Sequence, residues 1–98
     1  MKNNSAWNQN KTRDLFEAIL KLKTPEECRK FFRDLCTLEE VAAMADRWQA
    51  VKMIKEGGLS YREIAGKLNM STTTVARVAH WLNYGEGGYK LMLKRLGL

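Results

Sequence analysis

A run of hydroxyl-bearing residues followed by an arginine is the part of the chain best suited to chemistry. At the start and on the outer face of one predicted helix lie Thr72, Thr73, Thr74, Ala76 and Arg77. A threonine hydroxyl can bond a phosphate or a base edge, and its methyl group can contact a thymine methyl. The N–H groups at a helix start also favour phosphate. Because Ser71 already caps this helix, three further β-branched residues there are better explained by contacts with DNA than by helix formation.

Two more candidates begin the preceding predicted helix. Tyr61 and Arg62 are placed to hold backbone phosphates or to reach bases at the edge of a site. Two short helices that cross steeply need a tight turn, and Asn69 falls where that turn requires a left-handed backbone. The side chains that would pack the two helices together are Ile64, Ala65, Leu68, Val75 and Val78. We therefore predict a helix-turn-helix at residues 60–82.

The elements that must position these residues are predicted to be helices. Three segments, 24–27, 37–40 and 60–63, place a Ser or Thr three residues before a Glu, so that the hydroxyl caps a helix and the Glu bonds back to the capping residue's N–H. Apolar spacing predicts helices over Gln9–Leu22, Leu38–Glu56, Tyr61–Leu68 and Thr72–Tyr84. Two further short helices run through Cys28 to Leu35 and through Tyr89 to Leu96. The predicted fold class is all-α with six short helices, residues 1–11 forming a flexible N-terminal arm and residues 12–98 one helical domain.

Charge is unevenly distributed over the 98 residues. The net charge is +6, and the segment 59–98 has six Lys/Arg against two acids, a net of +4. This basic excess overlaps the predicted helix-turn-helix, as expected for a DNA-binding surface. No signal peptide is recognisable, and no apolar run approaches the ~20 residues of a membrane span. We expect a cytoplasmic, nucleoid-associated protein.

No arrangement of residues predicts catalysis. His80 is a lone histidine without an acid–base partner nearby in the sequence. There is no phosphate-binding glycine loop and no nucleophile motif. Cys28 and Cys36 would lie ~12 Å apart along a helix, too far for a disulfide, and no His or Cys cluster accompanies them. We expect no enzyme activity, no cofactor and no metal site.

Three stretches of the sequence resemble the Trp repressor family, and in particular its short branch of YerC/YecD-like proteins. They are the segments 35–47, 57–64 and 73–77, and the resemblance extends over most of residues 12–97. It implies an all-helical, intertwined homodimer whose N-terminal helices embrace the partner. It also implies two reading helices spaced ~34 Å apart, one DNA turn, to match a palindromic site.

The resemblance carries over only part of the family's tryptophan pocket. Arg47 and Arg77 match the two arginines that sandwich the indole, and Thr37 matches a position in the pocket wall. Val78 stands where the repressor has a glycine, and Trp81 where it has a serine near the ligand amine. Since two bulky apolar groups would fill space that the amino acid needs, we do not expect L-tryptophan to be the corepressor.

The sequence thus predicts a bacterial transcriptional regulator, with repression expected by family analogy, that binds double-stranded DNA as a homodimer. One alternative is a helix-turn-helix used only for protein interaction or as a scaffold, without a DNA role. Another is a recombination-associated DNA-binding domain separated from its catalytic part. Salt-dependent DNA binding separates the first alternative from the leading prediction.

Overall fold

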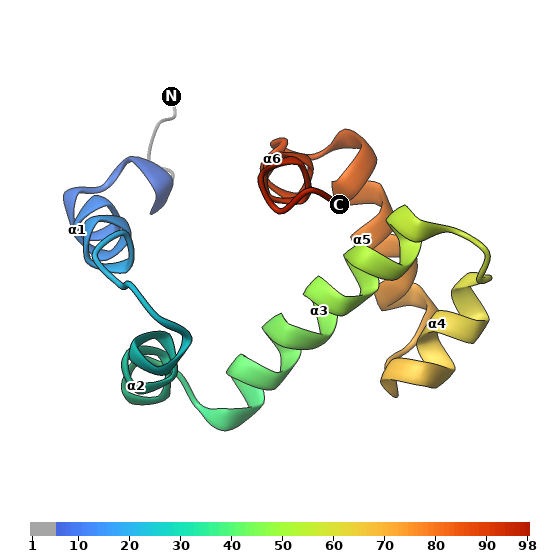
Figure 1. Ribbon diagram of the computed structural model, residues 1–98, viewed down its shortest axis with the longest axis horizontal. Helices are drawn as coiled ribbons and strands as arrows, with labels where there is room; N and C mark the ends of the chain where they lie inside the picture. Colours follow the sequence, from blue (N-terminus) through green and yellow to red (C-terminus); the bar gives the residue numbers. More distant parts are fainter. Residues whose placement is uncertain (1–5) are drawn as a thin grey trace. The chain divides into compact units, whose positions relative to one another are not determined.

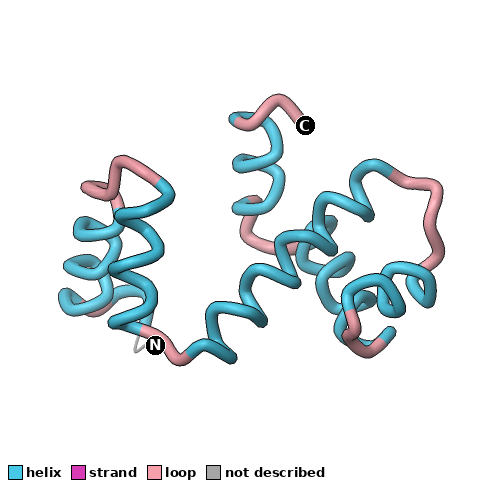
Figure 2. Tube along the Cα trace, turned by 60° about the horizontal axis from the view of Figure 1, so that its bottom comes forward, coloured by secondary structure: helices cyan, strands magenta, loops and turns pink. Residues whose placement is uncertain are grey.

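The computed structural model describes residues 6–98, and all regular structure in that range is helical (Figure 1, Figure 2). A short 3-10 helix, η1 (Ala6–Asn8), precedes six α-helices. These are α1 (Asn10–Ile19), α2 (Pro25–Leu35), α3 (Leu38–Glu56), α4 (Tyr61–Leu68), α5 (Thr72–Tyr84) and α6 (Gly88–Arg95). The predicted all-α class with six short helices is confirmed.

The chain divides into two compact units, Met1–Leu38 and Glu39–Leu98. The predicted domain of residues 12–98 therefore spans both units. The N-terminal unit contains η1, α1 and α2, and the C-terminal unit contains nearly all of α3 together with α4, α5 and α6.

The C-terminal unit holds a continuous hydrophobic core. Its buried members are Ala50, Val51, Ile64, Ala65, Val75, Val78, Leu82 and Leu93. They come from the second half of α3 and from each of the three later helices, so all four helices share this core. Burial of these side chains supplies the main driving force that holds α4 and α5 against the second half of α3.

The described part of the N-terminal unit has amphipathic helices but no buried core residue. None of the described residues in η1, α1 or α2 is buried. Trp7 stacks on Phe16 with 6.2 Å between ring centroids, and Phe31 meets Phe32 edge to face at 5.7 Å. Even so, Trp7 stays 71% exposed and Leu20 80% exposed. The apolar surface of this unit is thus left open to solvent.

The described start of the chain, from Ala6 onward, contains helical turns. Residues 6–8 form η1, the Thr12 hydroxyl donates to the Ala6 carbonyl at 2.6 Å, and α1 already begins at Asn10. The arm predicted for residues 1–11 thus contains η1 and the first two residues of α1, and its first five residues lie outside the described range.

Helix α1 ends earlier than predicted, and α2 begins directly after its capping residue, Thr24. α1 ends at Ile19 rather than at Leu22, and the N–H groups of Lys21 and Leu22 instead bond carbonyls three residues back. The residue before a proline avoids helical backbone, and Thr24 is indeed extended (φ −137°, ψ 158°). Its hydroxyl caps α2 by accepting from the Glu27 N–H at 3.1 Å. The Glu27 carboxylate accepts from the N–H of Lys23 at 2.9 Å rather than from Thr24, one residue earlier than predicted.

A candidate DNA-binding interface on the helix-turn-helix

The turn between α4 and α5 has the predicted left-handed residue. Asn69 adopts φ 54° and ψ 46°, and the N–H of Met70 returns to the Ala65 carbonyl at 3.0 Å. Glycine adopts this left-handed backbone most readily, and asparagine is among the residues that tolerate it next best. Asn69 therefore ends α4 and turns the chain directly into α5.

Packing of α4 on α5 fixes how α5 is presented. Ile64 and Val75 are fully buried, and Ala65 and Val78 are nearly so. Leu68 and Met70 are half-buried and pack against the same core. All five residues predicted to pack the two helices together thus do so, Met70 joins them, and the prediction of a helix-turn-helix is supported by its packing.

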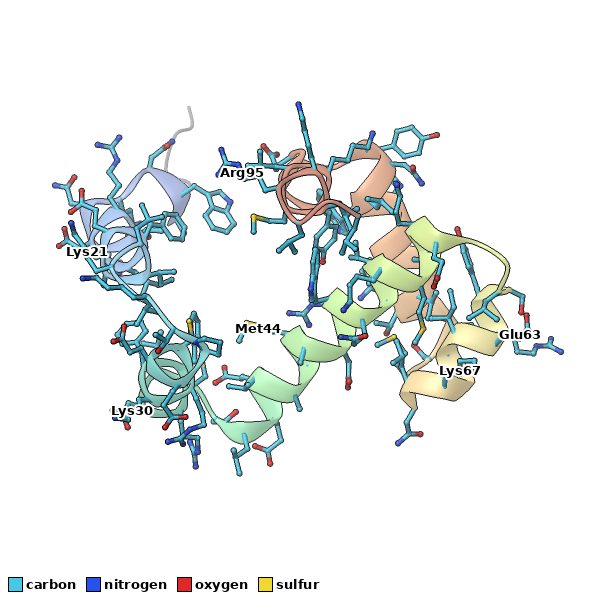
Figure 3. The ribbon with its side chains drawn as sticks, viewed as in Figure 1. Lys21, Lys30, Met44, Glu63, Lys67 and Arg95 are labelled. Atoms are coloured by element: carbon cyan, nitrogen blue, oxygen red, sulfur yellow. The ribbon has the colours of Figure 1, made fainter. Side chains whose placement is uncertain are left out.

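The start of α4 carries a complete capping box. Ser60 Oγ accepts from the Glu63 N–H at 3.1 Å, and a Glu63 carboxylate oxygen accepts from the Ser60 N–H at 2.8 Å. These bonds to the backbone and side chain of Ser60 hold the pKa of the Glu63 carboxyl below its ordinary value, with a smaller contribution from Lys67. Figure 3 shows Glu63 and Lys67 on this helix. The box fixes the first turn, where Tyr61 (45% exposed) and Arg62 are open to solvent.

The start of α5 exposes most of the predicted contact residues. Ser71 caps the helix by accepting from the Thr74 N–H at 3.0 Å. Exposed side chains on this helix include those of Thr72, Thr73, Ala76 and Arg77, whereas Thr74 is half-buried. Within the described residues neither Arg62 nor Arg77 pairs with an acid, so both guanidinium groups remain available to an anion.

A cavity of about 390 Å³ opens beside α5. The structure brings Arg47 of α3 and Arg77 of α5 to this one cavity, as expected from their match to the two arginines of the family's tryptophan pocket, a candidate effector pocket. Thr37, the third predicted pocket residue, lies in the other unit, immediately before α3. The remaining lining residues are Thr74, Val78, Trp81 and Tyr89.

Val78 and Trp81 do line the cavity, but they do not close it. Val78 is 3% exposed and belongs to the core, while Trp81 stays 51% exposed. Sequence reasoning missed Tyr89, which appeared only as one apolar position of the last helix. Its ring lies 6.3 Å from that of Trp48, so α6 reaches α3 at this point. Contacts between such distant positions leave no local signal in the sequence.

The described residues offer no other evident chemical centre. Across residues 6–98 there is no group of three or more His, Cys, Asp or Glu side chains that could hold a metal ion. In the same range no helix is both long and apolar enough to cross a membrane. His80 is exposed and lies beside the aromatic rings of Trp81 and Tyr84.

Comparison with known proteins decides the family. The family model described as Trp repressor protein matches residues 10–97. The chain belongs to the Trp repressor family. This family is regulatory rather than enzymatic, and the resemblance found in the sequence is confirmed.

Two relatives show how the chain compares with known proteins. It is 43% identical to the uncharacterized protein YerC of Bacillus subtilis over 82 residues, which cover 84% of this chain and 78% of YerC. It is 34% identical to a Trp operon repressor homolog of Chlamydia caviae over 89 residues, covering 91% and 88% of the two chains.

Solved structures of Trp repressor-like proteins share the fold. A TrpR-like protein from Eubacterium eligens is 39% identical, superposes with a TM-score of 0.88, and is matched over 94% of both chains. A Trp repressor-like protein from Staphylococcus aureus, also 39% identical, has a TM-score of 0.85 over 92% of this chain and 89% of its own.

Proposed function

We propose that this protein is a sequence-specific DNA-binding transcriptional regulator, with repression as its direction of control. The observation that carries the proposal is the exposed start of α5, where Thr72, Thr73, Ala76 and Arg77 stand clear of the core. In a helix-turn-helix the first residues of the second helix enter the major groove. Tyr61 and Arg62, at the start of α4, then hold the phosphate backbone.

We further propose that the protein acts as an intertwined homodimer in the bacterial cytoplasm. The open apolar surface of the N-terminal unit supports this, since Phe16, Leu20 and Leu35 are each more than 40% exposed. A second copy would bury these side chains and place two reading helices on one palindromic site.

L-tryptophan is not the corepressor in this proposal. The bulky side chains of Val78 and Trp81 share the cavity with Arg47 and Arg77, where the indole and amino group of tryptophan would have to fit. Calorimetric titration with L-tryptophan is expected to give no saturable heat. Saturable binding would refute this part of the proposal without touching the DNA-binding part.

Salt-dependent binding to genomic DNA fragments tests the central proposal. Each phosphate neutralised by Lys or Arg releases condensed counterions, so affinity should fall by at least tenfold between ~50 and ~200 mM salt. One fragment should be retained at the higher salt when others are not. If no fragment is retained even at ~50 mM salt, the helix-turn-helix has another use, and a protein-interaction or scaffold module becomes the better explanation.

A further inference from the structure

Thr74 differs from the two threonines before it. Thr72 and Thr73 are exposed, whereas Thr74 is half-buried and lines the cavity beside Arg47 and Arg77. The three residues have the same side chain and follow one another in the sequence. Their surroundings nevertheless separate them into two groups, and sequence reasoning treated them as one.

The hydroxyl of Thr74 is already engaged within the protein. Thr74 Oγ1 lies 2.8 Å from Ser71 Oγ, and Ser71 Oγ also accepts from the Thr74 N–H at 3.0 Å. Two hydrogen bonds therefore join the same two residues and close a small ring at the cap of α5. A serine hydroxyl has one proton and two acceptor sites, so it can make both bonds at once.

This ring restricts what Thr74 can do. A hydroxyl held by Ser71 and placed at a cavity wall cannot turn to a base edge unless it gives up that bond. Thr72 and Thr73 have no such restraint in the structure, because neither side chain makes a hydrogen bond within the described residues. The first turn of the reading helix is therefore divided between residues that face outward and one that holds the cap.

We propose that Thr74 is a positioning residue: it fixes the first turn of α5 through Ser71, while Thr72, Thr73 and Ala76 read the bases. This assignment rests on the proposed DNA-binding function and refines it. Thr74 then no longer belongs to the predicted set of DNA-contacting residues. Instead, it contributes equally to the affinity of the protein for every DNA sequence.

Substitution with valine separates the two roles, since valine keeps the β-branched shape and lacks the hydroxyl. The unaltered protein, Thr74→Val and the matched control Thr73→Val are each presented with a randomised pool of duplexes, and the bound sequences are read. Thr74→Val should keep the ranking of sequences and bind all of them roughly two- to tenfold more weakly, as expected for the loss of one hydrogen bond. Thr73→Val should alter the ranking. Thr74→Ser, which restores the hydroxyl, should recover the affinity.

A double-mutant cycle with Ser71→Ala tests the ring itself. Once Ser71 has lost its hydroxyl, Thr74→Val should have little further effect on DNA affinity, because its partner is already gone. A full additional loss in the Ser71→Ala background would overturn the proposal, as would a ranking altered by Thr74→Val. If the unaltered protein binds no DNA at any salt concentration, the proposed function fails and this assignment fails with it. If the unaltered protein binds DNA but Thr74→Val changes the ranking of the bound sequences, only the assignment of Thr74 is overturned and the proposed function stands.

Discussion

Neighbouring residues on α5 have different tasks although their chemistry is similar. The buried side chains of Val75 and Val78 attach the helix to the core, while Ala76, which follows Val75 directly, and Thr73, two residues before Val75, face solvent. A helix with 3.6 residues per turn produces this alternation without any special backbone geometry. The proposed contact with DNA therefore depends on a few side chains that contribute little to the stability of the fold.

Thr73→Ala and Arg62→Ala should affect DNA binding in different ways. Loss of the Thr73 hydroxyl and methyl removes the proposed base contact, so sequence preference should change by about 1–3 kcal/mol at one position. Loss of the Arg62 guanidinium removes a phosphate contact, so affinity should fall evenly across sequences and the salt dependence should become shallower. Competition binding against single-base variants of the preferred site measures both effects. Unchanged preference and affinity in both variants would contradict this docking.

The ends of the helices are set by local signals, and this is why much of the fold could be predicted. The hydroxyl-x-x-Glu pattern at Ser60 and the left-handed position at Asn69 act within four or five residues, and both were predicted from the sequence. The predicted partner of the Glu27 carboxylate was wrong by one residue, and the predicted first helix was three residues too long at its end. Both features depend on how the chain bends before Pro25. The meeting of Tyr89 with Trp48 and the Ser71–Thr74 bond depend on packing and rotamers, which periodicity does not encode.

Asn69 should be replaceable by glycine but not by alanine. At φ 54° an alanine side chain meets the steric penalty of left-handed backbone, and Asn69→Ala should lower the free energy of unfolding by about 1 kcal/mol. Asn69→Gly avoids that penalty and should stay within about 0.5 kcal/mol of the unaltered protein. Denaturant unfolding of both variants measures the difference. Equal free energies of unfolding for Asn69→Ala and Asn69→Gly would mean that the turn does not require a left-handed backbone at this position.

The cap of α4 should make stability depend on pH. The pKa of Glu63 is lowered in the folded state by its bonds to Ser60, so ionised Glu63 stabilises the fold above its ordinary pKa. This contribution is lost as the pH falls through the lowered folded-state pKa. Glu63→Gln should therefore have a lower melting temperature than the unaltered protein near pH 7, and the difference between the two melting temperatures should narrow at acidic pH. Melting temperatures measured across pH check this, and a gap that is constant from pH 7 to acid would contradict it.

For the molecule as a whole, the contrast between the two units is the main feature. The C-terminal unit has a buried core, and the described part of the N-terminal unit has no buried residue. Helices as short as α1 and α2 are marginal in water unless their apolar faces are packed. The stability of this unit should therefore depend on association with a second chain.

Thermal unfolding should consequently depend on protein concentration. For a dimer that unfolds to separate chains, a tenfold increase in concentration stabilises the folded state by about 1.4 kcal/mol, and the melting temperature rises. Leu20→Ser should weaken association, because Leu20 is 80% exposed on the apolar surface. Lys21→Ser, at the next and also exposed position, is the control and should leave association unchanged. Sedimentation equilibrium gives the mass directly, and a monomer with a concentration-independent melting temperature would rule out the proposed dimer.

The separation of buried from exposed positions along α5 also affects how such a protein can diverge. Mutations at Thr72, Thr73 or Ala76 leave the buried positions of the helix unchanged, so under the proposed function they would alter target choice with little loss of fold. After gene duplication, one copy can acquire a new set of target sites by a few substitutions at these surface positions. Descendants would then share the core and cap residues while differing at the start of this one helix.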